Sequence, residues 1–177
     1  DYQINVEALK KAQPKDLEAA EIEVRLGATW IDKKYVQEFM YETFGTPSYL
    51  KRGIRVNYSS LTGEWRVEGK STVLYNDVLA NTVFGTSRVN AYKLLEESLN
   101  LRDIRVYDTL QDPDGNERRV LNAKETTLAA QKQQAIRNAF RDWLWKDPAR
   151  RQTLVAQYNE TWNATRVREY DGQHLVF

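Results

Sequence analysis

The sequence predicts an α+β fold in which helices alternate with two β-hairpins, followed by a C-terminal antiparallel helix pair. Three observations support this prediction. Apolar residues recur at steps of three and four in several segments, which is the spacing of amphipathic helices. Two pairs of β-rich runs flank short turns, a pattern typical of hairpins. The last third of the chain carries two further helical patterns, separated by Asp147-Pro148.

The N-terminal part is expected to hold a helix, a strand and a second helix. The pattern at Val6–Ala12 predicts a short helix that ends near Pro14. Residues 22–26 alternate apolar and charged side chains, which indicates a half-buried strand. Asp32 is a good N-cap for a helix that continues to Phe44.

Two hairpins and two helices are predicted in the middle of the chain. β-rich runs on either side of residues 61–63 predict the first hairpin, and those on either side of Asp112–Asn116 predict the second. Between the hairpins we expect a helix ending at Phe84 and another at residues 88–99. A Gly-bearing turn at residues 85–87 joins these two helices.

Residues 76–121 follow the order of a winged helix-turn-helix, with the second hairpin as the wing. In that motif the second helix can enter the major groove while the wing contacts the DNA backbone. Arg and Asn can pair with base edges, whereas Lys and the wing arginines would mainly neutralise phosphate. The residues predicted to contact DNA are Ser87, Arg88, Asn90 and Lys93 on the helix and Arg118 and Arg119 on the wing.

The same residues have a simpler interpretation as an ordinary helical hairpin whose polar side chains face water. Glu96 and Glu97 follow on the same helix and would repel phosphate. The net charge of the chain is only +1, which gives little support to tight nucleic-acid binding. Both features favour the simpler interpretation, and DNA contact by residues 76–121 stands as a hypothesis.

The C-terminal part predicts two helices. Apolar residues between Leu128 and Leu144 fall on one helical face. Asp147-Pro148 ends this helix and starts the next, because a residue before proline avoids helical backbone and Asp is a good N-cap. The aromatic rings of both helices follow helical spacing, so we expect them to pack between the two helices rather than to stack on bases.

Two regions are therefore predicted along the chain. An α+β body covers residues 1–121 and includes the candidate winged-helix-like unit at residues 76–121. A helical extension covers residues 122–177. The boundary is placed at Asn122–Glu125, where β-rich sequence gives way to helical patterns.

Three stretches of sequence carry a resemblance to a known family. They are LNAKETTLAAQKQQAIRNAFRDWLWKDPARRQTLVAQYNETWN followed by REYDG, PKDLEAAEIEVRLGATWID (residues 14–32) and GTSRVNAYKLLEESLNLRD (residues 85–103). All three resemble segments of very large proteins carried by bacterial conjugative elements and phages. Those proteins join an adenine-specific DNA methyltransferase module to a Swi/Snf-like helicase module of the DEAD/DEAH type.

The resemblance implies that this region lies between the methyltransferase and helicase modules of a parent protein. The parent would use S-adenosylmethionine, and ATP with Mg²⁺, but the catalytic motifs of both modules lie outside the segment. No catalytic residue and no cofactor site is therefore expected here. The expected partners are the neighbouring modules and double-stranded DNA, in the bacterial cytoplasm.

Composition excludes several kinds of site. The chain has no Cys, which excludes disulfides, cysteine nucleophiles and thiolate metal sites. His174 is the only His, and we expect a solvated side chain there rather than a metal ligand or a general base. Gly69-Lys70-Ser71 lacks the upstream glycine of a phosphate-binding loop. No apolar run approaches the roughly 20 residues that span a bilayer, so no membrane contact is expected.

These observations predict a noncatalytic accessory domain that positions DNA or the neighbouring modules. The alternative is a protein-interaction or structural spacer domain that does not bind DNA. An enzymatic role would need a cluster of acid–base or metal-binding side chains, which the sequence does not provide.

Overall fold

The computed structural model describes residues 15–163 and contains helices together with two antiparallel two-stranded sheets, which confirms the α+β prediction. The helix predicted at Val6–Ala12 and the side chain of His174 lie outside the described residues. Contacts divide the described residues into two compact units, a larger one at residues 24–144 and a smaller one formed by residues 15–23 with 145–163. The helix that begins at the predicted boundary of Asn122–Glu125 belongs to the larger unit as far as Leu144.

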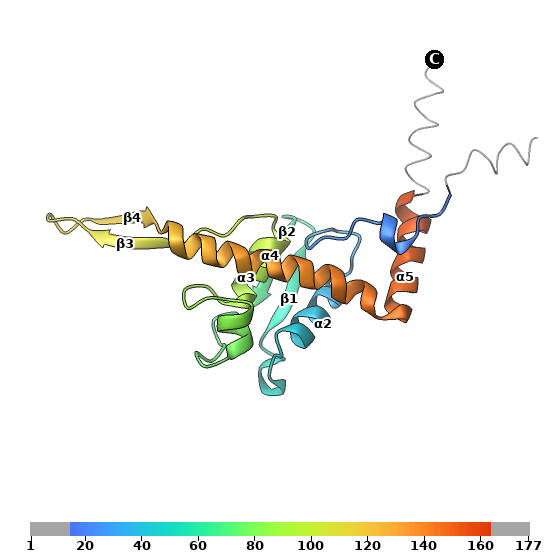
Figure 1. Ribbon diagram of the computed structural model, residues 1–177, viewed down its shortest axis with the longest axis horizontal. Coiled ribbons are helices and arrows are strands. Elements are labelled where there is room, and N and C mark those ends of the chain that lie inside the picture. The colour runs from blue at the N-terminus through green and yellow to red at the C-terminus, as the bar shows by residue number, and fades with distance from the viewer. Residues whose placement is uncertain (1–14, 164–177) are drawn as a thin grey trace, which may run out of the picture. The chain divides into compact units, whose positions relative to one another are not determined.

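Both predicted hairpins are present (Figure 1). The larger unit contains, in chain order, α2 (Lys33–Thr43), η2 (Ser48–Leu50), β1 (Arg55–Ser59), β2 (Glu64–Glu68), η3 (Leu79–Val83), α3 (Ala91–Leu99), β3 (Tyr107–Gln111), β4 (Glu117–Leu121) and most of α4 (Ala123–Lys146). The smaller unit contains η1 (Ala19–Glu21), α5 (Pro148–Tyr158) and η4 (Asn159–Asn163).

The β1–β2 hairpin is held by side chains that come from its flanking helices. Val56 and Val67 lie opposite each other in the hairpin and both are buried. Gln37 of α2 accepts a hydrogen bond from the Val56 N–H at 3.1 Å, and Glu96 of α3 accepts one from the Val67 N–H at 2.9 Å. A two-stranded sheet is marginally stable alone and its outer N–H groups are unpaired. Helix side chains therefore take the place of the missing third and fourth strands.

The aromatic core of the larger unit joins α2 and α4. Phe140 and Trp143 of α4 both contact Phe39 of α2, with ring centroids 5.2 and 5.8 Å from it. Phe39 also contacts Phe44 edge-on at 6.0 Å. These ring contacts hold α2 against α4, and packing of the rings against the second C-terminal helix stays a prediction.

Three elements predicted within residues 1–121 are shorter than expected or absent. The apolar side chains of residues 22–26 are buried, but the segment forms no strand, and no strand in the described part of the chain pairs with it. The helix expected to end at Phe84 is reduced to the single π-type turn η3. The helix expected at residues 88–99 begins at Ala91, because Asn90 takes the N-cap position with extended backbone.

The first strand of the second predicted hairpin begins at Tyr107. The residues just before it form no strand, and they bind side chains of α4. Gln133 accepts a hydrogen bond from the Ile104 N–H at 3.0 Å, and Thr126 accepts one from the Val106 N–H at 2.9 Å. Ile104 and Val106 are both buried, as their alternation in the sequence predicts, but the element that covers them is the helix α4 and not a sheet.

Candidate nucleic-acid interface

The β3–β4 hairpin extends beyond the N-terminal end of α4 and away from β1 and β2 (Figure 1). All five residues of β4 are exposed, as are the last three of β3. Leu110 lies opposite Arg118, and Thr109 lies opposite Arg119. Gly115, with φ at +83°, closes the turn. A hairpin that packs on neither face gains little from burial, so its position must be fixed at its base.

Arg88 fixes the base of this hairpin. Its Nη1 lies 2.8 Å from Asp108 Oδ1, and its Nη2 donates a hydrogen bond to the Tyr107 carbonyl at 2.8 Å. Asn122 donates to the other carboxylate oxygen of Asp108 at 2.9 Å. The hydrogen bond from Arg88 is the main cause that lowers the pKa of the Asp108 carboxyl. The guanidinium predicted to contact DNA is thus engaged within the chain.

The helix α3 is a core helix. Seven of its nine residues are buried. Its N-cap Asn90 accepts a hydrogen bond from the Lys93 N–H at 3.0 Å and donates one to the Lys70 carbonyl at 2.8 Å. The Lys93 ammonium lies 3.0 Å from Glu97, and Ser87 lies in the bend before the helix. A helix that enters the major groove must expose one face to the bases, and the burial of α3 does not support that role.

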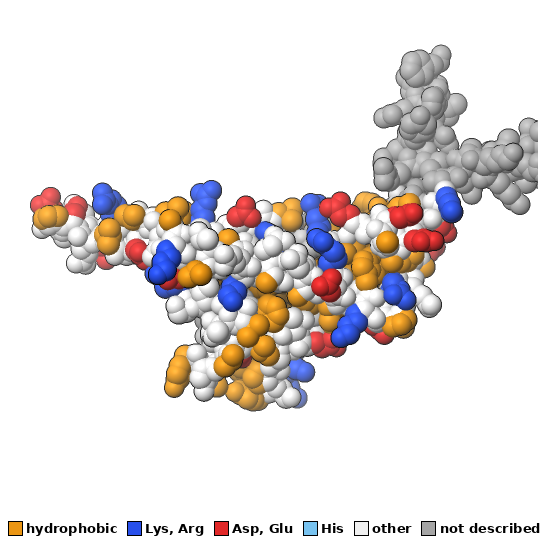
Figure 2. All heavy atoms as spheres, viewed as in Figure 1, with side chains coloured by type: hydrophobic (Ala, Val, Ile, Leu, Met, Phe, Trp, Pro, Cys, Tyr) orange, Lys and Arg blue, Asp and Glu red, His pale blue; other side chains and the backbone are white. Residues whose placement is uncertain are grey.

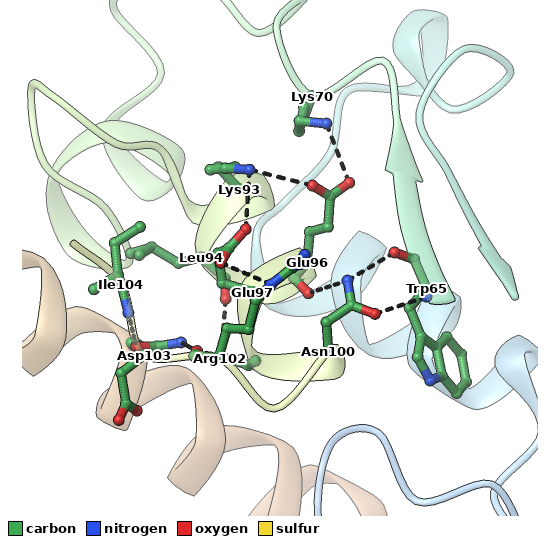
Figure 3. A network of polar contacts seen from close by, with 12 residues as sticks. Trp65, Lys70, Lys93, Leu94, Glu96, Glu97, Asn100, Arg102, Asp103 and Ile104 are labelled. Carbon is green, nitrogen blue, oxygen red and sulfur yellow. Dashed lines mark hydrogen bonds and ion pairs between the residues drawn. The ribbon is translucent and has the colours of Figure 1, made fainter. Parts of the chain in front are cut away.

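A polar network surrounds the buried carboxylate of Glu96 (Figure 3). Its Oε2 accepts the Val67 N–H at 2.9 Å and lies 3.1 Å from the Lys70 ammonium, while Oε1 lies 3.4 Å from the Lys93 ammonium. Burial acts to raise the pKa of Glu96, but the Val67 hydrogen bond and the two lysines outweigh it, so the net shift is downward. The Glu96 carboxylate therefore pairs with the charge of Lys93 and accepts an N–H group on the side of β2 that has no neighbouring strand.

Among the six predicted contact residues, Ser87, Arg88, Arg118 and Arg119 are exposed, and the two arginines of β4 have no carboxylate partner among the described residues. The Arg119 guanidinium lies over the Tyr107 ring, 4.3 Å from its centroid. The hairpin holds more acidic than basic residues: Asp108, Asp112, Asp114 and Glu117 against Arg118 and Arg119. Figure 2 shows red and blue side chains mixed at its end. An excess of cations is the electrostatic mark of DNA-binding elements, and this hairpin lacks it.

An exposed apolar surface precedes α3 and was missed by the sequence analysis. Five of the thirteen exposed large hydrophobic side chains of the described residues fall within residues 74–83. They are Leu74, Tyr75, Val78, Leu79 and Val83. In Figure 2 orange side chains gather over this segment, which is green in Figure 1. A full helix at residues 76–84 would have turned an apolar face inward, whereas the single turn η3 leaves these side chains in solvent.

No group of three or more His, Cys, Asp or Glu side chains within residues 15–163 could hold a metal ion. In the same range no helix combines the length and the apolar character of a membrane-spanning segment.

The larger unit is a small α+β domain in which one hairpin is packed between helices and the other projects.

The chain belongs to the DUF8437 family, a domain of unknown function whose family model matches residues 25–164. Comparison with curated proteins gave no match, and neither did comparison with solved structures.

Proposed function

We propose that this chain is a noncatalytic accessory domain that docks on a neighbouring protein module. The observation that carries this proposal is the exposed apolar surface at residues 74–83. Scattered single hydrophobic side chains are normal on a protein surface, but a contiguous group of them marks an interaction site. Tyr75 is 93% exposed and Val78 is 63% exposed, so both have most of their apolar surface available for a partner.

The segment is ordered by contacts of its own, which lowers the entropic cost of docking. Asp77 accepts a hydrogen bond from the Ala80 N–H at 3.1 Å, and Asn81 donates one to the Leu74 carbonyl at 2.9 Å. Ala80 is fully buried. The close approach of Gly85 to the Ala80 carbonyl leaves no space for a side chain, since a Cβ there would lie 2.1 Å from that oxygen.

The resemblance to methyltransferase–helicase fusion proteins suggests the occupant of this surface. In a protein of that kind the region precedes the helicase module, so we propose the helicase module as the partner. The role of the domain is then to position that module relative to its neighbours. Catalysis with ATP and Mg²⁺, or with S-adenosylmethionine, would belong to the modules and not to this domain.

Binding between the 177-residue chain and the separately purified helicase module, measured by isothermal titration calorimetry, tests this proposal. The double substitution Tyr75→Ser with Val78→Ser should weaken binding by about 2 kcal/mol, roughly thirtyfold in Kd, because it removes exposed apolar area. Leu61→Ser removes an equally exposed side chain from the β1–β2 turn and should leave binding unchanged. Absence of binding by the unmodified chain, or equal loss in both variants, contradicts the proposal. Binding to the methyltransferase module alone contradicts the choice of partner.

A second candidate function is contact with duplex DNA through the β3–β4 hairpin. It is favoured by Arg118 and Arg119, consecutive residues of an exposed strand whose side chains point to opposite faces of the hairpin. Two phosphate contacts predict a weak complex, with a slope of about −2 when log K is plotted against log salt. A mobility-shift titration at two salt concentrations measures this slope, and no retarded complex at low salt refutes the hypothesis.

A further inference from the structure

Three arginine side chains line one pocket of about 310 Å³ in the larger unit. Arg25 comes from the loop before α2, whereas Arg137 and Arg141 lie one turn apart on α4. The amide of Gln134 and an apolar wall that includes Leu101 complete the lining. Among the described residues, no Asp or Glu lines this pocket.

The positive charge of this pocket is largely uncompensated. Arg137 lies 3.3 Å from Asp103, but the Asp103 side chain is 87% exposed and solvent screens this pair. Within residues 15–163 the side chains of Arg25 and Arg141 take part in neither an ion pair nor a hydrogen bond. Three guanidinium groups around one pocket produce a local positive potential that attracts an anion.

A neighbouring polar pocket of about 520 Å³ shows the opposite arrangement. Its cations include Lys93 and Arg102, and both pair with Glu97, at 3.0 and 3.2 Å. Arg105 lines that pocket as well, together with the carboxylates of Glu97 and Asp103. The arginine pocket differs from it because no carboxylate of the described residues lines it.

One residue beside the arginine pocket, Leu101, has an unfavourable backbone conformation. Leu101 has φ at +58°, a region that bulky side chains avoid. It occupies the position after α3 where glycine is usual, and the Arg102 N–H closes the helix end by donating to the Glu97 carbonyl at 2.9 Å. Gly27 has φ at +93°, which glycine adopts without strain, and a Cβ there would lie 2.4 Å from the Leu99 carbonyl oxygen. Strain such as that at Leu101 concentrates at functional sites.

We propose that this pocket binds a phosphate group carried on a sugar. Guanidinium groups pair bidentately with phosphate, and three terminal oxygens can engage three arginines at once, which a carboxylate with two oxygens cannot. Small-molecule pockets span about 300–1,000 Å³, so a volume of about 310 Å³ suits one phosphate with a pentose rather than a dinucleotide. The apolar wall beside Leu101 suits the sugar carbons. This site is distinct from the apolar docking surface and goes beyond the function proposed for it.

Ribose 5-phosphate is the probe for this site, and ribose is the control that lacks the phosphate. Calorimetric titration of the 177-residue chain is expected to show binding of ribose 5-phosphate with a Kd of about 1 mM or tighter, and no binding of ribose. Arg25→Gln and Arg141→Gln each remove an exposed cation and should weaken binding about tenfold or more. Arg66→Gln removes an exposed arginine of β2 that does not line the pocket, and should leave the Kd unchanged.

A duplex oligonucleotide titrated against the same variants identifies the source of the phosphate. Weaker duplex binding in Arg25→Gln and Arg141→Gln, but not in Arg66→Gln, assigns the site to a nucleic-acid backbone. Binding of ribose 5-phosphate without duplex binding assigns it to a free sugar phosphate. The phosphate site is overturned if neither probe binds, if ribose binds as well as its phosphate, or if Arg66→Gln weakens binding equally.

Discussion

Replacing Glu96 with Ala is expected to destabilise the larger unit far more than removing a lysine that pairs with it. The Glu96 side chain is only 8% exposed, and its Oε2 accepts the Val67 N–H at 2.9 Å. Loss of a hydrogen bond to a charged group costs about 1.5–3 kcal/mol, and the N–H left unpaired beside a buried valine costs a similar amount. Because these two effects overlap, we expect a loss of about 3 kcal/mol.

The ion pair between Lys70 and Glu96 contributes less to the free energy of unfolding. The Lys70 side chain is 38% exposed, and an ion pair open to solvent contributes about 0.2–1 kcal/mol. Lys70→Met should therefore lower the free energy of unfolding by less than about 1 kcal/mol. Glu96→Gln keeps an oxygen that can accept the Val67 N–H and should fall between the two other variants.

Urea unfolding at pH 7, followed by circular dichroism, measures all three variants. The reasoning fails if Lys70→Met costs as much as Glu96→Ala, because the ion pair would then outweigh the hydrogen bond. A pH series gives a second check. The pKa of Glu96 in the folded chain lies below its ordinary value of 4.5, so its contribution is present above that pH and is lost as the pH falls through the folded-state pKa. In Glu96→Gln the free energy of unfolding should therefore fall less steeply as the pH is lowered.

Two further substitutions probe the region beside the arginine pocket. Leu101→Gly should raise the free energy of unfolding by up to about 1 kcal/mol, because glycine accepts a φ of +58° without strain, and a lower Tm in thermal unfolding would contradict this. Gln133→Leu should lower the free energy of unfolding by about 2–4 kcal/mol, because it leaves the Ile104 N–H and the Arg102 carbonyl without their partner at 3.0 and 2.7 Å. Urea unfolding measures this loss, and a value below about 1 kcal/mol would show that the segment finds other partners.

Much of the local structure could be predicted because its causes lie within a few residues. Asp32 caps α2 by accepting the Lys34 N–H at 2.9 Å, and Asp147 caps α5 by accepting the Arg150 N–H at 3.0 Å. The turn at Asp112–Asn116 closes the second hairpin as its composition predicts. Caps and turns depend on near neighbours in sequence, so the sequence reveals them directly.

The candidate site was less predictable because it depends on distant residues. The pattern at residues 88–99 predicts a helix with polar residues at its start, but not that Arg88 would bind Asp108 at the base of a hairpin. Arg25 and Arg141 look like ordinary solvated charges in the sequence, and only the fold brings them to one pocket. Arg118, Arg119, Ser87 and Arg88 are exposed, but the Arg88 guanidinium is bound to Asp108.

The sequence by itself therefore determined the α+β class, both hairpins and the helix starts at Asp32 and Asp147, through periodicity, caps and turn residues. Tertiary structure decided which of these elements are buried. It enclosed α3 in the core, left five large apolar side chains of residues 74–83 exposed, and gathered three arginines around a pocket that no carboxylate lines. The physical reason is that local backbone conformation follows from neighbouring residues, whereas burial and charge pairing depend on segments that meet only when the chain folds.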